Sequence, residues 1–243
     1  MKLYDNIQNE LSKKNINVQV GNMYDMMAIW KSWYRGNVND FHYYNATLAD
    51  GTTIKCERLT MNMPKKVCED FAKLLWSEKV QISLDNKTKT EKLWKVLDSK
   101  KNNFSVSFPI AIEKAFALGT GCLVEYKVDD ETIIEYIDGD NCLVYENTNT
   151  YITGFITVDQ FSRGMGSKKM YYTHLTYHEY KNGVYTKYNE LYASKNENVI
   201  GREIDFASMF PEVENPVIYE TDTPHFQFIK PNIANNFDMN SPM

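Results

Sequence analysis

His174 and His178 are the residues whose spacing first suggests chemistry, because two histidines four apart on a helix could bind one metal ion. Their neighbours, however, alternate between polar and apolar residues, which is typical of a β-strand. Four residues along a strand separate two side chains by roughly 13 Å, too far for ligands of a single ion. The sequence therefore predicts no metal site here, and it favours structural roles for His42 and His225.

Acidic residues could act as a general acid and base or bind a hard cation. Asp138 and Asp140 flank a glycine, but the segment lacks the later Glu and the full spacing of a calcium-binding loop, which indicates a turn. With Glu179 and Glu190 they leave one alternative open, a cytoplasmic hydrolase or glycan-processing enzyme. That alternative requires two carboxylates about 5 to 9 Å apart in a concave cleft.

The glycine and cysteine patterns do not match known reactive motifs. Gly119-Thr120-Gly121 lacks the third glycine of a dinucleotide-binding loop, and Gly164-Met165-Gly166 lacks the Gly-Lys-Ser/Thr ending of a phosphate-binding loop. The four cysteines are widely spaced, which favours buried free thiols over a zinc site or disulfides. They are Cys56, Cys68, Cys122 and Cys142. The sequence thus predicts no catalytic, cofactor-binding or metal-binding residue and no cofactor.

Composition narrows the class of protein. The chain has 243 residues, 43% hydrophobic and 24% charged, which suits a folded protein with a sizeable core. No run approaches the roughly 18 apolar residues of a membrane-spanning helix, so we expect no membrane association. The net charge of −5 argues against strong binding of DNA phosphates by this chain.

Helical signals dominate the first 120 residues. Asn22 and Gly36 bracket an aromatic helix, Pro64 suits the first turn of another, and Asp50-Gly51 indicates a hairpin between two short strands. A further short strand is expected at residues 80–84. The expected helices are residues 4–14, 22–34, 64–76, 88–97 and 104–118.

From residue 121 onward the period changes to that of β-strands. Asn182-Gly183 fits a type I′ turn between two long strands, and residues 206–216 contain prolines that indicate irregular structure. Residues 171–192 hold seven of the 17 tyrosines, and we expect this hairpin to be an exposed contact surface. The expected strands are residues 122–128, 132–137, 151–161, 170–180, 184–192 and 226–229. The fold class predicted is α+β, a helical half followed by an antiparallel β-rich half.

Four segments in this order resemble the portal proteins of tailed bacteriophages, in particular long-tailed phages or prophages of Gram-positive hosts. The aromatic helix reads IWKSWYRG from Ile29 to Gly36, and the next segment reads RLTMNMPKKVCEDFAKLLWSE from Arg58 to Glu78. A helix, a small-residue turn and a meander follow over residues 115–126 and 133–145. The last segment runs from Ile229-Lys230-Pro231-Asn232 to Ser241-Pro242.

The resemblance implies a structural protein and no enzyme. Similar proteins form a ring, generally of about twelve subunits, at one capsid vertex, through which double-stranded DNA is packaged and ejected. The implied partners are copies of itself, the major capsid or scaffold protein, the terminase motor and the head-tail adaptor. The implied location is the virion, after synthesis in the host cytoplasm.

The resemblance also implies that this chain is the N-terminal wing portion, with a helical part at 1–120 and a β-rich part at 121–243, and with stem, clip and crown absent from it. Trp30, Trp33 and Tyr34 would then pack in the core or the wing. A passive adaptor or binding module remains the other alternative, because it too needs only surfaces.

Overall fold

The computed structural model describes residues 2–18, 22–77, 80–128, 130–148 and 151–230. Two compact units divide the chain. One contains residues 22–140 and 229–230, and the other contains residues 2–18 and 141–228. Strands β3 (Gly121–Val128) and β4 (Glu131–Asp138) belong to the unit with most of the helices, and helix α1 (Lys2–Lys13) belongs to the unit with the larger sheet. The α+β class is confirmed.

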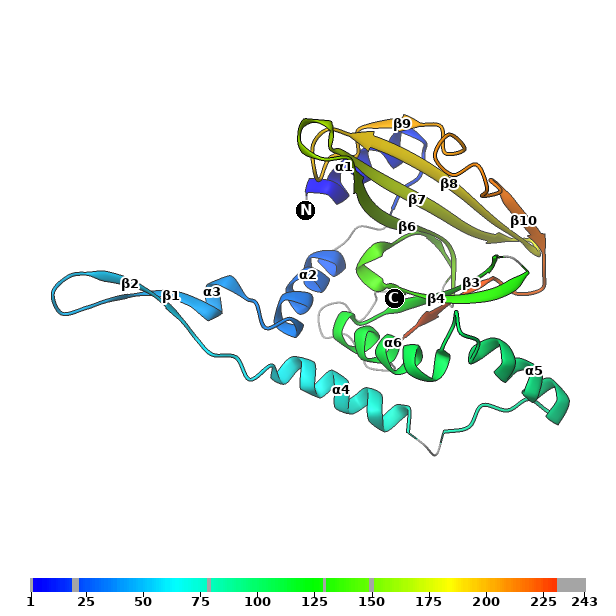
Figure 1. Ribbon diagram of the computed structural model, residues 1–243, viewed down its shortest axis with the longest axis horizontal. Coiled ribbons are helices and arrows are strands. Elements are labelled where there is room, and N and C mark those ends of the chain that lie inside the picture. The colour runs from blue at the N-terminus through cyan, green and yellow to red at the C-terminus, as the bar shows by residue number, and fades with distance from the viewer. Residues whose placement is uncertain (1, 19–21, 78–79, 129, 149–150, 231–243) are drawn as a thin grey trace. The chain divides into compact units, whose positions relative to one another are not determined.

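The first unit is mainly helical (Figure 1). Phe71 of α4 stacks on Phe116 of α6 with ring centroids 5.2 Å apart, and Trp76 meets Phe108 edge-on at 5.0 Å. These ring contacts pack α4 and the residue after it against α6. The helices are α2 (Asn22–Tyr34), α3 (Asn39–His42), α4 (Met63–Leu75), α5 (Lys87–Leu97) and α6 (Phe104–Leu118).

Glycines end α6 and begin the hairpin that follows it. Gly119 caps the helix with φ of 80°, a left-handed conformation that glycine adopts without strain. β3 (Gly121–Val128) then pairs antiparallel with β4 (Glu131–Asp138). A Cβ on Gly121 would lie 2.3 Å from the hydroxyl of Tyr136, so the glycine makes room for that ring. The short helix η1 (Gly139–Asn141) follows β4.

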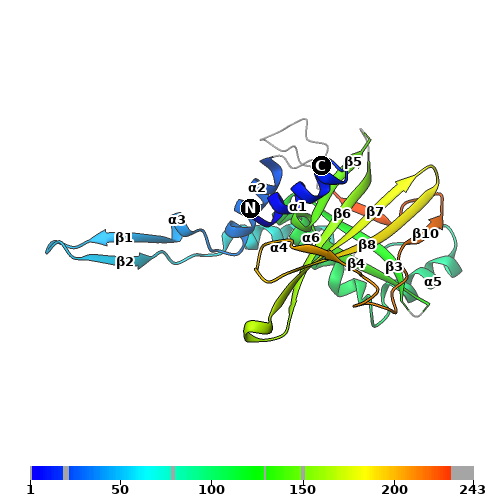
Figure 2. The same ribbon diagram turned by 90° about the horizontal axis from the view of Figure 1, so that it is seen from above.

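Two short strands of the same unit form an isolated hairpin. β1 (Tyr43–Thr47) pairs antiparallel with β2 (Thr53–Glu57), and Gly51 turns the chain with φ of 85°. The two strands pair with each other in a separate two-stranded sheet (Figures 1 and 2). We call residues 43–57 the arm.

The second unit is built on one antiparallel sheet. Its strand order is β10-β8-β7-β6-β5, and β9 also pairs with β8. The long β7–β8 hairpin turns at Asn182 and Gly183, both at positive φ, as a type I′ turn requires. The strands are β5 (Cys142–Asn147), β6 (Ile152–Arg163), β7 (Met170–Lys181), β8 (Val184–Ser194), β9 (Arg202–Ile204) and β10 (Val217–Glu220). Helix α1 (Lys2–Lys13) and the short helix η2 (Gly166–Lys168) belong to this unit.

The prediction of an exposed tyrosine surface on the β7–β8 hairpin is wrong. Tyr177, Tyr185 and Tyr192 are fully buried, and none of the seven tyrosines is exposed. On one face Tyr177 stacks on Tyr188 with centroids 4.1 Å apart. On the other face Phe226 of β11 (Phe226–Ile229) packs 6.1 Å from Tyr185. Side chains on both faces of the hairpin therefore pack against other residues of this unit.

Other local expectations had mixed outcomes. Residues 80–84 form no strand, because Thr90 and Trp94 of α5 donate hydrogen bonds to the carbonyl oxygens of Leu84 and Ile82. Asn86 caps α5, which begins at Lys87, one residue earlier than expected, and its side chain accepts a hydrogen bond from the amide of Thr88 at 2.8 Å. Strands β5, β9 and β10 were not predicted. The strand at residues 226–229 is confirmed, whereas residues 231–243 lie outside the described part of the chain.

Candidate assembly surfaces

The two central histidines serve packing within the sheet. Both lie on β7, as the strand pattern predicted. Burial lowers the pKa of His178 to about 3, and its Nδ1 lies 2.8 Å from the hydroxyl of Tyr185. Burial also lowers the pKa of His174, whose Nε2 lies 3.0 Å from Oδ1 of Asn189. Among the described residues no group of histidines, cysteines and carboxylates is arranged to hold a metal ion.

The carboxylates Asp138 and Asp140 bind lysines. Nζ of Lys31 lies 2.5 Å from Oδ2 of Asp140 and 3.9 Å from Oδ2 of Asp138. Nζ of Lys114 lies 3.0 Å from Oδ1 of Asp138. These contacts connect α2 and α6 to the end of β4. The charges neutralise each other, and the arrangement stabilises the fold of the helical unit.

Glu179 and Glu190 do not form a catalytic pair either. Glu190 lies opposite Leu175 in the β7–β8 ladder, four residues from Glu179 along β7, which separates the two by roughly 13 Å. Glu179 binds Lys181 at 2.6 Å. That spacing exceeds the range used by paired carboxylates in glycoside hydrolysis. The structure therefore gives the enzyme alternative no support from these four residues.

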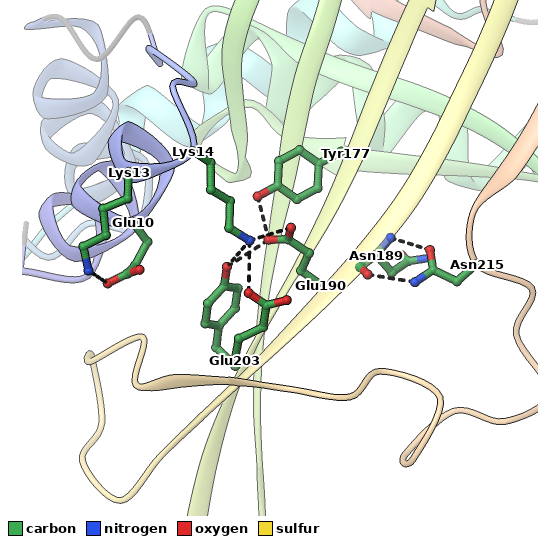
Figure 3. Close-up of polar contacts among 9 residues, drawn as sticks. Glu10, Lys13, Lys14, Tyr177, Asn189, Glu190, Glu203 and Asn215 are labelled. Carbon is green, nitrogen blue, oxygen red and sulfur yellow. Dashed lines mark hydrogen bonds and ion pairs between the residues drawn. The ribbon is translucent and has the colours of Figure 1, made fainter.

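A partly exposed charge cluster attaches the end of α1 to the sheet (Figure 3). Nζ of Lys14 lies 2.7 Å from Oε1 of Glu190, 3.1 Å from Oε2 of Glu203 and 3.0 Å from the hydroxyl of Tyr192. Burial by itself would lower the pKa of Lys14, but these hydrogen bonds outweigh it and raise that pKa. The hydroxyl of Tyr177 donates to Oε2 of Glu190 at 2.8 Å. Every polar group in this cluster has a partner, so its role is structural.

The predicted aromatic helix packs inside the helical unit. The ring of Trp33 lies 5.1 Å from that of Phe41, and the hydroxyl of Tyr34 donates to Glu113 of α6. Trp30 lies beside Gly119, where an added Cβ would come within 3.4 Å of its ring. All three side chains are half-buried, which confirms that they take part in packing.

The arm has one mainly apolar face, where the guanidinium of Arg58 lies 5.0 Å from the centre of the Tyr44 ring. In an antiparallel pair, residues directly opposite each other share a face, and successive residues alternate between faces. Tyr44 lies opposite Cys56, and Ala46 lies opposite Ile54. Leu48 continues this row, while the other face carries residues such as Asn45 and Lys55. We call the face with Tyr44, Ala46, Leu48, Ile54 and Cys56 the arm face.

A second apolar surface lies on α4 and the segment before it. Leu59 is 97% exposed, Met61 84% and Leu74 76%. Met63, Val67 and Leu74 lie on one face of α4, which also carries Asp70, and Leu75 lies farther around the helix, beyond Phe71. We call the surface formed by Leu59, Met61, Met63, Val67, Leu74 and Leu75 the α4 strip.

Sequence reasoning recognised the hairpin and the helix but not that their apolar sides stay uncovered. The arm face had a signal, since apolar residues alternate with polar ones on both sides of Asp50-Gly51. The strip had one too, because Val67, Leu74 and Leu75 recur at helical spacing. Neither pattern tells whether a core of the same chain covers the surface.

Comparison with known proteins gives the family. A family model described as phage portal protein, SPP1 Gp6-like, matches residues 22–233. No curated protein matches the chain. None of the described helices is long and apolar enough to span a membrane. Because the match extends from the start of α2 past β11, it covers most of the chain. The chain therefore belongs to the phage portal protein family, SPP1 Gp6-like.

Proposed function

We propose that this chain is a structural subunit of a phage portal, part of a ring of about twelve copies at one vertex of the capsid. In this role DNA passes through the ring during packaging and ejection. The terminase motor, the head-tail adaptor and the major capsid or scaffold protein attach to it. The observation that carries the proposal is the family match over residues 22–233.

The surfaces of the chain support this role. A ring subunit needs two different patches that contact its two neighbours, because head-to-tail contacts close a ring when the rotation allows it. The arm face and the α4 strip are two such patches on one unit. The net charge of −5 suits a wall past which DNA slides without strong binding.

The proposal includes the place of the chain in the portal and in the infected cell. We assign it to the wing, with a helical part at 1–120 and a β-rich part at 121–243. Synthesis takes place in the host cytoplasm, and the finished protein is located in the virion. The chain performs no bond chemistry, in keeping with carboxylates that are paired with lysines.

Sedimentation velocity over a hundredfold concentration range, with negative-stain imaging of each fraction, tests the proposal. A portal subunit is expected to shift toward larger particles with rotational symmetry and a central hole as the concentration rises. A compact monomer at every concentration would refute ring assembly by this chain. Incubation with double-stranded DNA at physiological salt should leave the sedimentation of either form unchanged.

A further inference from the structure

We draw no further inference here: the strongest candidate, the exposed apolar surface of the α4 strip, carries none, because Lys66 and Asp70 interrupt its apolar residues and nothing in the structure shows what covers it.

Discussion

Asn102 is expected to be the most sensitive polar side chain of the helical unit. It is 5% exposed and makes three hydrogen bonds. Its Nδ2 donates to the carbonyl oxygens of Val96 at 2.7 Å and Thr132 at 2.9 Å, and its Oδ1 accepts from the amide of Ile134 at 2.8 Å. One side chain thus connects the end of α5 to β4.

Replacement of Asn102 by Ala removes all three bonds and leaves backbone groups buried without that partner. A typical hydrogen bond contributes about 1 kcal/mol, and an unsatisfied buried group costs about 1 to 3 kcal/mol. Val96 also accepts from the amide of Ser99, which limits its share of the loss. We therefore expect Asn102→Ala to lower the free energy of unfolding by about 2 to 4 kcal/mol.

Urea denaturation followed by tryptophan fluorescence measures this change, because Trp94 of α5 donates a hydrogen bond to the carbonyl of Ile82 in the same unit. The matched control is Asn45→Ala, at an exposed position of β1, with an expected change within about 0.5 kcal/mol. If Asn102→Ala were as mild as this control, Asn102 would not connect α5 and β4 as described.

Three further changes test the sheet unit and its turns. Burial holds His178 neutral with a pKa of about 3, below about 6.5 for the unfolded chain. Between these values the unfolded state binds one more proton, so the free energy of unfolding should fall as pH falls, by about 1.4 kcal/mol per pH unit. In the His178→Phe variant, the free energy of unfolding measured at several pH values should lack this part of the pH dependence. A pH dependence equal to that of the wild type would contradict the burial of a neutral His178. Lys14→Met leaves Glu190 and Glu203 without their cation. Because the side chain of Lys14 is 33% exposed and that of Glu203 is 56% exposed, solvent screening limits the expected cost to about 1 kcal/mol in urea denaturation. Lys13→Met, with a side chain 68% exposed, should cost under about 0.5 kcal/mol, and equal costs would count against the cluster. Gly201→Ala would place a Cβ 2.1 Å from the carbonyl oxygen of Ala193 at φ of 77° and should lower the melting temperature more than Gly51→Ala, which is also at positive φ but has no atom within 4 Å of the new Cβ.

Elements with a strong local signal could be predicted from the sequence. Gly51, Asn182 and Gly183 turn their hairpins at positive φ, and Gly119 ends α6 for the same reason. In the first hairpin, Oδ1 of Asp50 also accepts a hydrogen bond from the amide of Thr52. The short strands β9 and β10 lack such a signal. They form because they pair with the free edge of β8, where β9 pairs with residues 191–193 and β10 pairs with residues 184–187.

Burial depends on tertiary contacts that no local pattern contains. The tyrosines of the β7–β8 hairpin look like a surface in sequence, yet Phe206 packs 5.4 Å from His174 on one face, from a segment that has no regular period. The α4 strip is the reverse case. Its pattern is that of a helix that packs on a core, but its own chain leaves Leu74 exposed.

Cryo-electron microscopy of the assembled protein tests the central claim most directly. The account predicts class averages with rotational symmetry and a central hole. Particles that are uniformly single chains, under the conditions in which the protein is most concentrated, would contradict the claim that this chain is a ring-forming portal subunit.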